Sequence, residues 1–109
     1  MSDWLPRAQN KLASLNYDGL NQASYEGAGD LVLELARIKM KPVRIVRTAE
    51  NLIAFWLFNG GKTRIEACED GEFVLSILYP DRPATHLEFK TASAVGDELT
   101  REVMGDSRW

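Results

Sequence analysis

Very few side chains of this sequence could carry out chemistry. His86 is the only histidine and Cys68 the only cysteine. No serine or cysteine motif accompanies His86, so a catalytic triad cannot be argued, and one cysteine forms neither an internal disulfide nor a cysteine metal cluster. Cys68 stands between Glu66 and Glu69, whose charges oppose a thiolate, so we interpret it as an unreactive thiol. The sequence therefore predicts no catalytic residue, no metal site and no enzyme activity.

A glycine-rich stretch, Gly27-Ala28-Gly29, stands before Asp30, where the apolar spacing indicates a helix. Glycines before a helix are typical of phosphate-binding loops, but those loops follow a strand, and the nucleotide-binding kind also carries a lysine. Neither feature is present here. We therefore interpret this stretch as an ordinary loop and predict no cofactor.

Composition and charge are those of one globular domain. The 109 residues are 45% hydrophobic and 27% charged, with a net charge of −3 that comes from the acidic second half. Neither half is basic enough for nonspecific nucleic-acid binding to be the default. A basic group gathers where a helix should meet a strand, and helix C-termini favour cations. Its members are Arg37, Lys39, Lys41, Arg44 and Arg47.

The N-terminus and the apolar runs bear on location. Met1-Ser2-Asp3-Trp4 has neither the basic nor the apolar part of a signal peptide. No apolar run is long enough to cross a membrane. We therefore expect a cytoplasmic protein with no membrane partner.

Apolar spacing predicts three helices, at residues 3–16, about 30–40 and 92–104. Pro42 should end the second helix, and the Thr91 side chain should cap the third. Residues 21–29 are polar and contain glycine, so they are predicted as a loop with an uncertain helix start.

Runs rich in β-branched and aromatic residues predict strands near residues 43–47, 53–58, 62–68 and 73–79. Residues 86–90 alternate in the same way and are predicted as a last strand. Helices and strands that are segregated along the chain indicate an α+β fold. The predicted domain, residues 1–109, has two N-terminal helices packed on a four-stranded antiparallel meander sheet, plus a C-terminal helix.

The turns predict the register of the strands. Gly60-Gly61 is typical of a two-residue hairpin turn, which would place Trp56 opposite Ile65. A short loop near Glu50-Asn51 would then place Ile45 beside Trp56. Because side chains alternate, Ile53, Phe55 and Leu57 would point to the opposite face.

The next turn allows two registers. A two-residue loop at Asp70-Gly71 and a three-residue loop that begins at Glu69 differ by one residue, which exchanges the two faces of the following strand. A left-handed Gly71 is what the three-residue loop requires. This loop also places Ile65 opposite Leu75 and keeps the apolar residues together, so we prefer it.

In this register, the face turned away from the N-terminal helices combines apolar residues with charges, and contiguous exposed apolar patches mark interaction sites. Alternatively, the C-terminal helix covers this face, or the strands pair in a different register. The predicted partner-binding residues on this face and its adjoining turn are Arg44, Val46, Phe55, Leu57, Arg64, Glu66, Glu69, Asp70 and Glu72.

A wider pattern runs through residues 12–79: an aromatic-Asp-Gly element, a helix ended by proline, a strand, and two hairpins with glycine turns. Its residues are Tyr17-Asp18-Gly19, Pro42, Val43, Ile53-x-Phe55-Trp56, Ile65-Glu66 and Asp70-Gly71. This pattern resembles a small family of uncharacterised bacterial α+β proteins. That family has Trp-Asp-Gly followed closely by Gly-Ala, whereas this chain has Tyr17 and a later Gly27-Ala28. The resemblance implies an α+β fold and a place among accessory proteins encoded near toxin or mobile-element genes. It supplies no activity that could be assigned to this chain.

Small size, acidity and one partly apolar sheet face predict a non-catalytic protein-binding module. Inhibitors, immunity proteins, antitoxins and phage-encoded anti-defence proteins are of this kind, and an acidic one suits a basic, nucleic-acid-binding partner. One alternative is an assembly module that forms a homodimer through the same face. The other is a single-stranded nucleic-acid-binding protein that uses the basic group.

Overall fold

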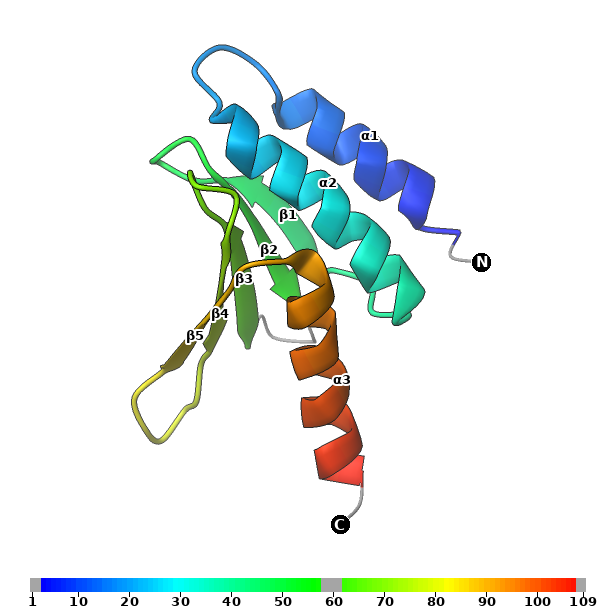
Figure 1. Ribbon diagram of the computed structural model, residues 1–109, viewed down its shortest axis with the longest axis vertical. Helices are drawn as coiled ribbons and strands as arrows, with labels where there is room; N and C mark the ends of the chain where they lie inside the picture. Colours follow the sequence, from blue (N-terminus) through cyan, green and yellow to red (C-terminus); the bar gives the residue numbers. More distant parts are fainter. Residues whose placement is uncertain (1–2, 58–61, 108–109) are drawn as a thin grey trace.

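The computed structural model describes residues 3–57 and 62–107, with side chains described as far as residue 101 (Figure 1). The elements follow the order α1 (Leu5–Leu15), α2 (Gln22–Arg37), β1 (Arg44–Arg47), β2 (Ile53–Leu57), β3 (Thr63–Ala67), β4 (Phe73–Ile77), β5 (Thr85–Phe89) and α3 (Ala92–Ser107). The strands form one antiparallel meander in sequence order. The α+β class is confirmed, and the predicted count of four strands is wrong by one, because residues 85–89 pair fully with β4.

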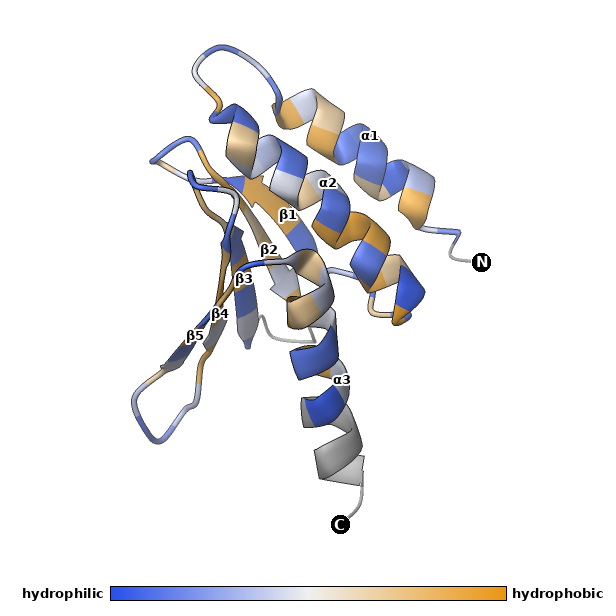
Figure 2. Ribbon diagram, viewed as in Figure 1, coloured by the Kyte–Doolittle hydropathy of each residue, from blue (hydrophilic) through white to orange (hydrophobic). Residues whose placement is uncertain are grey.

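All three helices lie on the same face of the sheet (Figure 1). Helix α2 packs on β2 and β3, α1 packs on α2 and β1, and α3 packs on α2, β4 and β5. Figure 2 shows hydrophobic and hydrophilic residues mixed along α1 and α2, as expected for helices with one buried side. The third helix therefore covers the inner face with the others, and no helix of the described chain covers the outer face.

One hydrophobic core joins the helices to the inner face of the sheet. The side chains of Phe55, Leu31, Leu35 and Val95 are fully buried in it. A backbone amide of α3 confirms the predicted cap, because the Ala94 N–H donates to the Thr91 hydroxyl at 3.1 Å. The alternative in which the C-terminal helix covers the outer face is therefore wrong, because Val95 and Leu99 are buried in the core on the inner face.

Helix α2 begins well before the predicted start. Asn21 caps it, with its side-chain oxygen accepting from the Ser24 N–H at 2.9 Å. Gly27 lies inside the helix, where a Cβ would stand 3.4 Å from the ring of Phe73. The predicted loop at residues 21–29 is therefore wrong, because the Asn21 cap starts the helix earlier and the tertiary packing of this segment tolerates Gly27 despite its low helix propensity.

The register between β2 and β3 differs from the prediction by one residue. Phe55 pairs with Ile65, and Trp56 pairs with Arg64. Strand β1 follows, with Arg44 rather than Ile45 beside Trp56. The predicted Gly60-Gly61 turn lies outside the described residues. A one-residue shift exchanges the two faces, so Phe55 enters the core and Trp56 lies on the outer face.

The register between β3 and β4 is as predicted. Ile65 pairs with Leu75. Gly71 has a φ of 84°, the left-handed conformation that the three-residue turn requires. The apolar pattern selected the correct loop at this turn.

Ser24 connects α2 to the sheet at one buried point. Its hydroxyl donates to the Ala67 carbonyl at 2.5 Å and accepts from the Ile53 N–H at 2.9 Å. Ile53 and Ala67 are partners in the β2–β3 register. The hydroxyl therefore satisfies two buried backbone groups of two strands and fixes α2 over them.

The Tyr17-Asp18-Gly19 element has a structural role. The Arg47 guanidinium donates to the Tyr17 and Asp18 carbonyls at 3.1 and 2.7 Å and stacks 4.0 Å from the centre of the Tyr17 ring. Gly19 has a φ of 89°, and a Cβ there would stand 3.3 Å from Nη2 of Arg47. Arg47 thus holds the α1–α2 loop against β1.

We expect Ser24→Ala to lower the free energy of unfolding by about 2 kcal/mol or more, because it leaves a buried N–H and a buried carbonyl without partners. Chemical denaturation measures the change. The control is Ser14→Ala, which removes an exposed hydroxyl that bonds only to the Lys11 carbonyl in its own helix. Equal stabilities of the two variants would contradict the role assigned to Ser24.

Candidate functional site

The outer face of the sheet carries two rows of side chains that run across all five strands. The arginine row joins residues that are partners in register: Arg44, Trp56, Arg64, Ser76 and His86. The glutamate row lies beside it: Val46, Ala54, Glu66, Val74 and Glu88. The strand register thus sorts the charges of this face by sign.

The arginine row centres on Trp56. This side chain is half-buried and stands between Arg44 on one strand and Arg64 on the next. The Arg64 guanidinium lies 5.9 Å from the centre of the indole ring, within range of a cation–π interaction. At the far end, the Ser76 hydroxyl is hydrogen-bonded to Nδ1 of His86 at 2.8 Å. The row therefore presents an aromatic surface flanked by cations.

The glutamate row carries smaller apolar side chains beside its two carboxylates. Ala54 has no exposed surface, and Val46 and Val74 are half-buried. Glu66 approaches Arg64 of the other row, at 3.7 Å between carboxylate and guanidinium. The two rows therefore contact each other through one ion pair near the middle of the sheet.

Carboxylates gather around Cys68, just beyond the glutamate row. Burial raises the pKa of the Cys68 thiol, and the charges of Glu66, Asp70 and Glu72 raise the pKa further. Glu88 acts in the same direction from β5. These four carboxylates, together with Glu69 in the turn, are called the acidic end of the outer face. The interpretation of Cys68 as an unreactive thiol agrees with this environment.

The predicted site residues divide into two groups. The charged and turn residues, with Val46, lie together on the outer face and at its acidic end; they are Arg44, Val46, Arg64, Glu66, Glu69, Asp70 and Glu72. Phe55 and Leu57 do not lie there, since their side chains are 0% and 1% exposed in the core. The predicted exposure of these two residues is wrong, because the prediction rested on the wrong β2 register.

The outward direction predicted for His86 and Glu88 by the alternation of the last strand is confirmed, whereas Trp56 was missed as an outer-face residue. A signal for Trp56 was present, because β3 alternates Arg64 and Glu66 with buried Thr63 and Ile65. Pairing Phe55 with Ile65 would have joined two large apolar residues and placed Trp56 beside Arg64. Such aromatic and cation pairs are typical of cross-strand neighbours.

The basic group at the junction of α2 and β1 is divided by the fold. Arg37 pairs with Glu34, with Nε 3.0 Å from the carboxylate, and Arg47 holds the α1–α2 loop. Lys41 and Arg44 instead line a pocket with residues of α1. The predicted group therefore does not form one surface for a nucleic-acid strand.

Neither a metal cluster nor a membrane helix occurs in the part of the chain that the structure describes. Its histidine, cysteine and acidic side chains form no group of three or more that could hold a metal ion. Its helices are too short or too polar to span a bilayer. Over the described residues, the outer face presents charged side chains, the Trp56 ring and the hydrogen-bonded Ser76–His86 pair.

Comparison of the chain with protein-family models, curated proteins and solved structures gives no match. The geometry and charges of the outer face are therefore the basis for proposing a function.

We expect the Cys68 thiol to react with iodoacetamide several-fold more slowly than free cysteine at the same pH, because its raised pKa leaves less thiolate. Replacing Glu66 and Glu72 by Gln removes two of the charges that raise the pKa, so the reaction should become faster. The control is Glu26→Gln on the exposed side of α2. Labelling rates followed by mass spectrometry over a range of pH measure the effect. An unchanged rate in the double variant would contradict the arrangement of the acidic end.

Proposed function

We propose that this chain is a non-catalytic protein-binding module of the inhibitor type, which covers a basic protein surface with the outer face of its sheet. The observation that carries the proposal is the placement of all three helices on one side (Figure 1). Each helix buries its apolar side in the core, whereas the opposite sheet face keeps an exposed arrangement of charges around Trp56. An uncovered antiparallel sheet face with an aromatic centre suits a protein interface.

The acidic end supports a basic partner. Its carboxylates come from β3, the following turn and β5, and they lie close enough to act together on Cys68. Complementary charge accelerates encounter and disfavours wrong partners. Trp56 supplies the apolar anchor that interfaces commonly have near their centre. A nucleic-acid-binding surface of another protein has the basic chemistry that such a face would cover.

We expect Trp56→Ala to weaken partner binding by roughly thirtyfold, which corresponds to about 2 kcal/mol for an anchor at an interface centre. Glu69→Lys with Glu72→Lys should weaken binding further as salt is lowered, because the charges then repel a basic partner. Asp70 is left unchanged because its carboxylate accepts the Glu72 N–H at 2.9 Å and holds the turn.

The measurement begins with capture of partners from a lysate of the native host, followed by affinities of each variant for the purified partner. Leu33→Ala is the apolar control, since Leu33 is 53% exposed and belongs to α2, a helix that lies on the inner face of the sheet. Glu26→Lys with Asp30→Lys is the charge control on the same helix. A true complex must also slow labelling of Cys68. Absence of any partner that depends on Trp56, or a complex that leaves Cys68 unprotected, would remove the proposal.

A second copy of the chain is the other candidate partner, and the two rows favour it. Consider a two-fold axis that is perpendicular to the strands and lies between the two rows. It would place each residue of one row opposite a residue of the other row in the second copy, two positions away on the same strand. Arg64 would then face Glu66 of the second copy. Trp56 would face Ala54, and His86 would face Glu88. Opposite charges meet, and the largest side chain meets the smallest, so the face is complementary to itself.

Under this second candidate, we expect Arg64→Glu to produce monomers, because four carboxylates would meet at the axis. Combining Arg64→Glu with Glu66→Arg exchanges the charges and should restore the dimer, since each copy again presents both signs. Sedimentation velocity at several concentrations measures the state, and circular dichroism checks that each variant is folded. Wild-type protein that stays monomeric at high concentration would dismiss the homodimer and leave the first proposal standing.

A further inference from the structure

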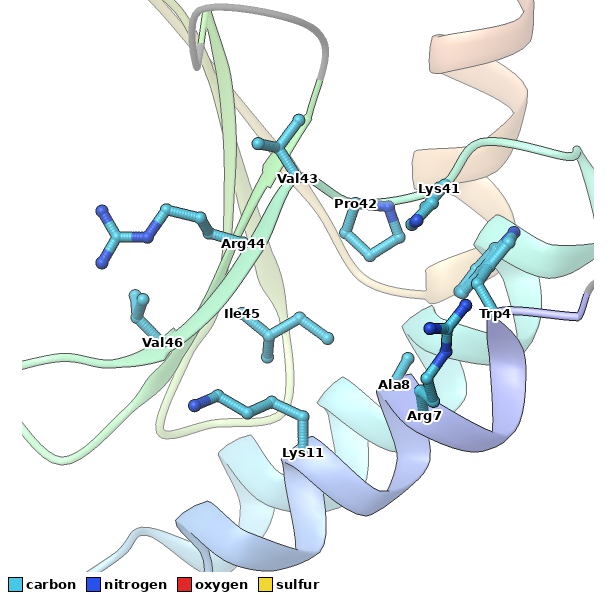
Figure 3. A pocket seen from close by; sticks show the side chains of 10 residues that line it. All are labelled: Trp4, Arg7, Ala8, Lys11, Lys41, Pro42, Val43, Arg44, Ile45 and Val46. Carbon is cyan, nitrogen blue, oxygen red and sulfur yellow. The ribbon is translucent and has the colours of Figure 1, made fainter.

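A pocket of about 380 Å³ lies between α1 and β1, apart from the centre of the outer face. Its walls come from the first turns of α1, with Trp4, Arg7 and Lys11, and from the segment that runs from Lys41 to Val46 (Figure 3). This volume is within the range of pockets that hold small ligands. The pocket is therefore large enough for a molecule of the size of a mononucleotide.

The charge of the pocket contrasts with that of the chain. Four of its lining residues are cations, namely Arg7, Lys11, Lys41 and Arg44, and none is acidic, although the net charge of the protein is −3. The ion pairs within the described residues involve Arg37, Arg64 and Arg101, and none of the pocket cations. A concave surface whose charged lining residues are all cations concentrates a positive potential and attracts anions.

The cations are not equivalent. In the view of Figure 3, Trp4, Arg7 and Lys41 lie at one end of the pocket and Lys11 lies toward the other. Arg44 points to the opposite side of its strand, where it belongs to the arginine row. Contact with a ligand inside the pocket therefore falls to Arg7, Lys11 and Lys41. Their exposed side chains can reach an anion without losing an existing ion pair.

The remaining walls are apolar. Trp4 is half-buried and packs against the core, Pro42 is buried, and Ile45 is 8% exposed. An indole ring beside cations can stack on the planar ring of a ligand while the cations bind a phosphate of the same ligand. A purely inorganic anion would leave this apolar wall unused.

We propose that this pocket binds a phosphate ester that carries a planar ring, of the type of a mononucleotide. Arg7 and Lys41 bind the phosphate next to Trp4, whose indole stacks on the ring. Lys11 binds a second phosphate or the far end of the ligand. The pocket borders the proposed protein-binding face at Arg44 and Val46, but the three cations that would contact the ligand lie outside that face, so either function can be present without the other.

The test uses ATP as the probe, with affinities measured by isothermal titration calorimetry at low salt. Lys11→Glu with Lys41→Glu should weaken ATP binding by at least roughly tenfold, the usual scale for losing charge-assisted contacts to phosphate. The control is Lys39→Glu with Lys62→Glu, which changes the net charge equally at exposed positions outside the pocket. Inorganic pyrophosphate should compete with ATP, and adenosine should bind more weakly than ATP.

Trp4→Leu separates stacking from charge. It should reduce ATP affinity and leave pyrophosphate affinity unchanged, and thermal unfolding checks that the variant is folded. Because Trp4 also packs against the core, Trp4→Phe serves as a second variant that keeps a ring and should retain most of the ATP affinity.

Two sources of the same chemistry are distinguished by short oligonucleotides with and without a 5′-phosphate. Preference for the phosphorylated strand over ATP would assign the pocket to a strand end, and preference for ATP would assign it to a free nucleotide. Absence of ATP binding, or equal loss in the pocket variants and their control, would overturn the proposal. The proposal would also be overturned if both oligonucleotides bound with equal affinity and more tightly than ATP, because the protein would then bind the backbone of a strand.

Discussion

The register of β2 against β3 is the constraint on which the rest of this structure depends, and the hydroxyl of Ser24 fixes it. Ser24 is fully buried in α2 and hydrogen-bonds to Ile53 and Ala67, which lie 29 and 43 residues further along the chain. A shift of one residue would offer different backbone groups to this hydroxyl. The same shift would exchange Phe55 and Trp56 between the core and the solvent. The hydrogen bonds of this serine belong to the register in which Trp56, and not Phe55, is available to a partner.

The layering of the helices decides that the outer face stays open. The first turns of helix α3 pack against α2 on the inner side, where a Cβ at Gly96 would come within 2.7 Å of Cγ of Glu34. Glycine weakens a helix by about 1 kcal/mol relative to alanine. Its presence in α3 is explained by this close approach between the two helices. Because α3 occupies the inner side, the sheet needs no apolar outer face, and the outer face carries charges instead.

The charges of this acidic protein are arranged locally rather than spread evenly. On the outer face, cations and carboxylates form separate rows that meet at the Arg64–Glu66 pair. Between α1 and β1, by contrast, the pocket collects cations alone, although Arg44 borders both regions. The first arrangement suits an extended protein surface whose basic region meets the acidic end, and the second suits a small anion. The net charge of the chain predicts neither arrangement, since each depends on which strand or helix stands next to it.

Local patterns in the sequence were sufficient to predict the α+β class, the order of the elements and the turn at Gly71, because apolar spacing and turn chemistry act over a few residues. The charged residues of the outer face could also be predicted, since Arg64 and Glu66 alternate with buried neighbours. The possible pairing of Trp56 with Arg64 was the one local signal that Trp56, not Phe55, faces the solvent, and the tertiary structure decided between them. Both registers join apolar runs of similar strength, and the choice rests on the distant hydrogen bonds of Ser24 and on the packing of α2 against the sheet. The early start of α2 depends on the Asn21 cap, and the side on which α3 lies depends on its packing against α2, β4 and β5, which no local pattern shows.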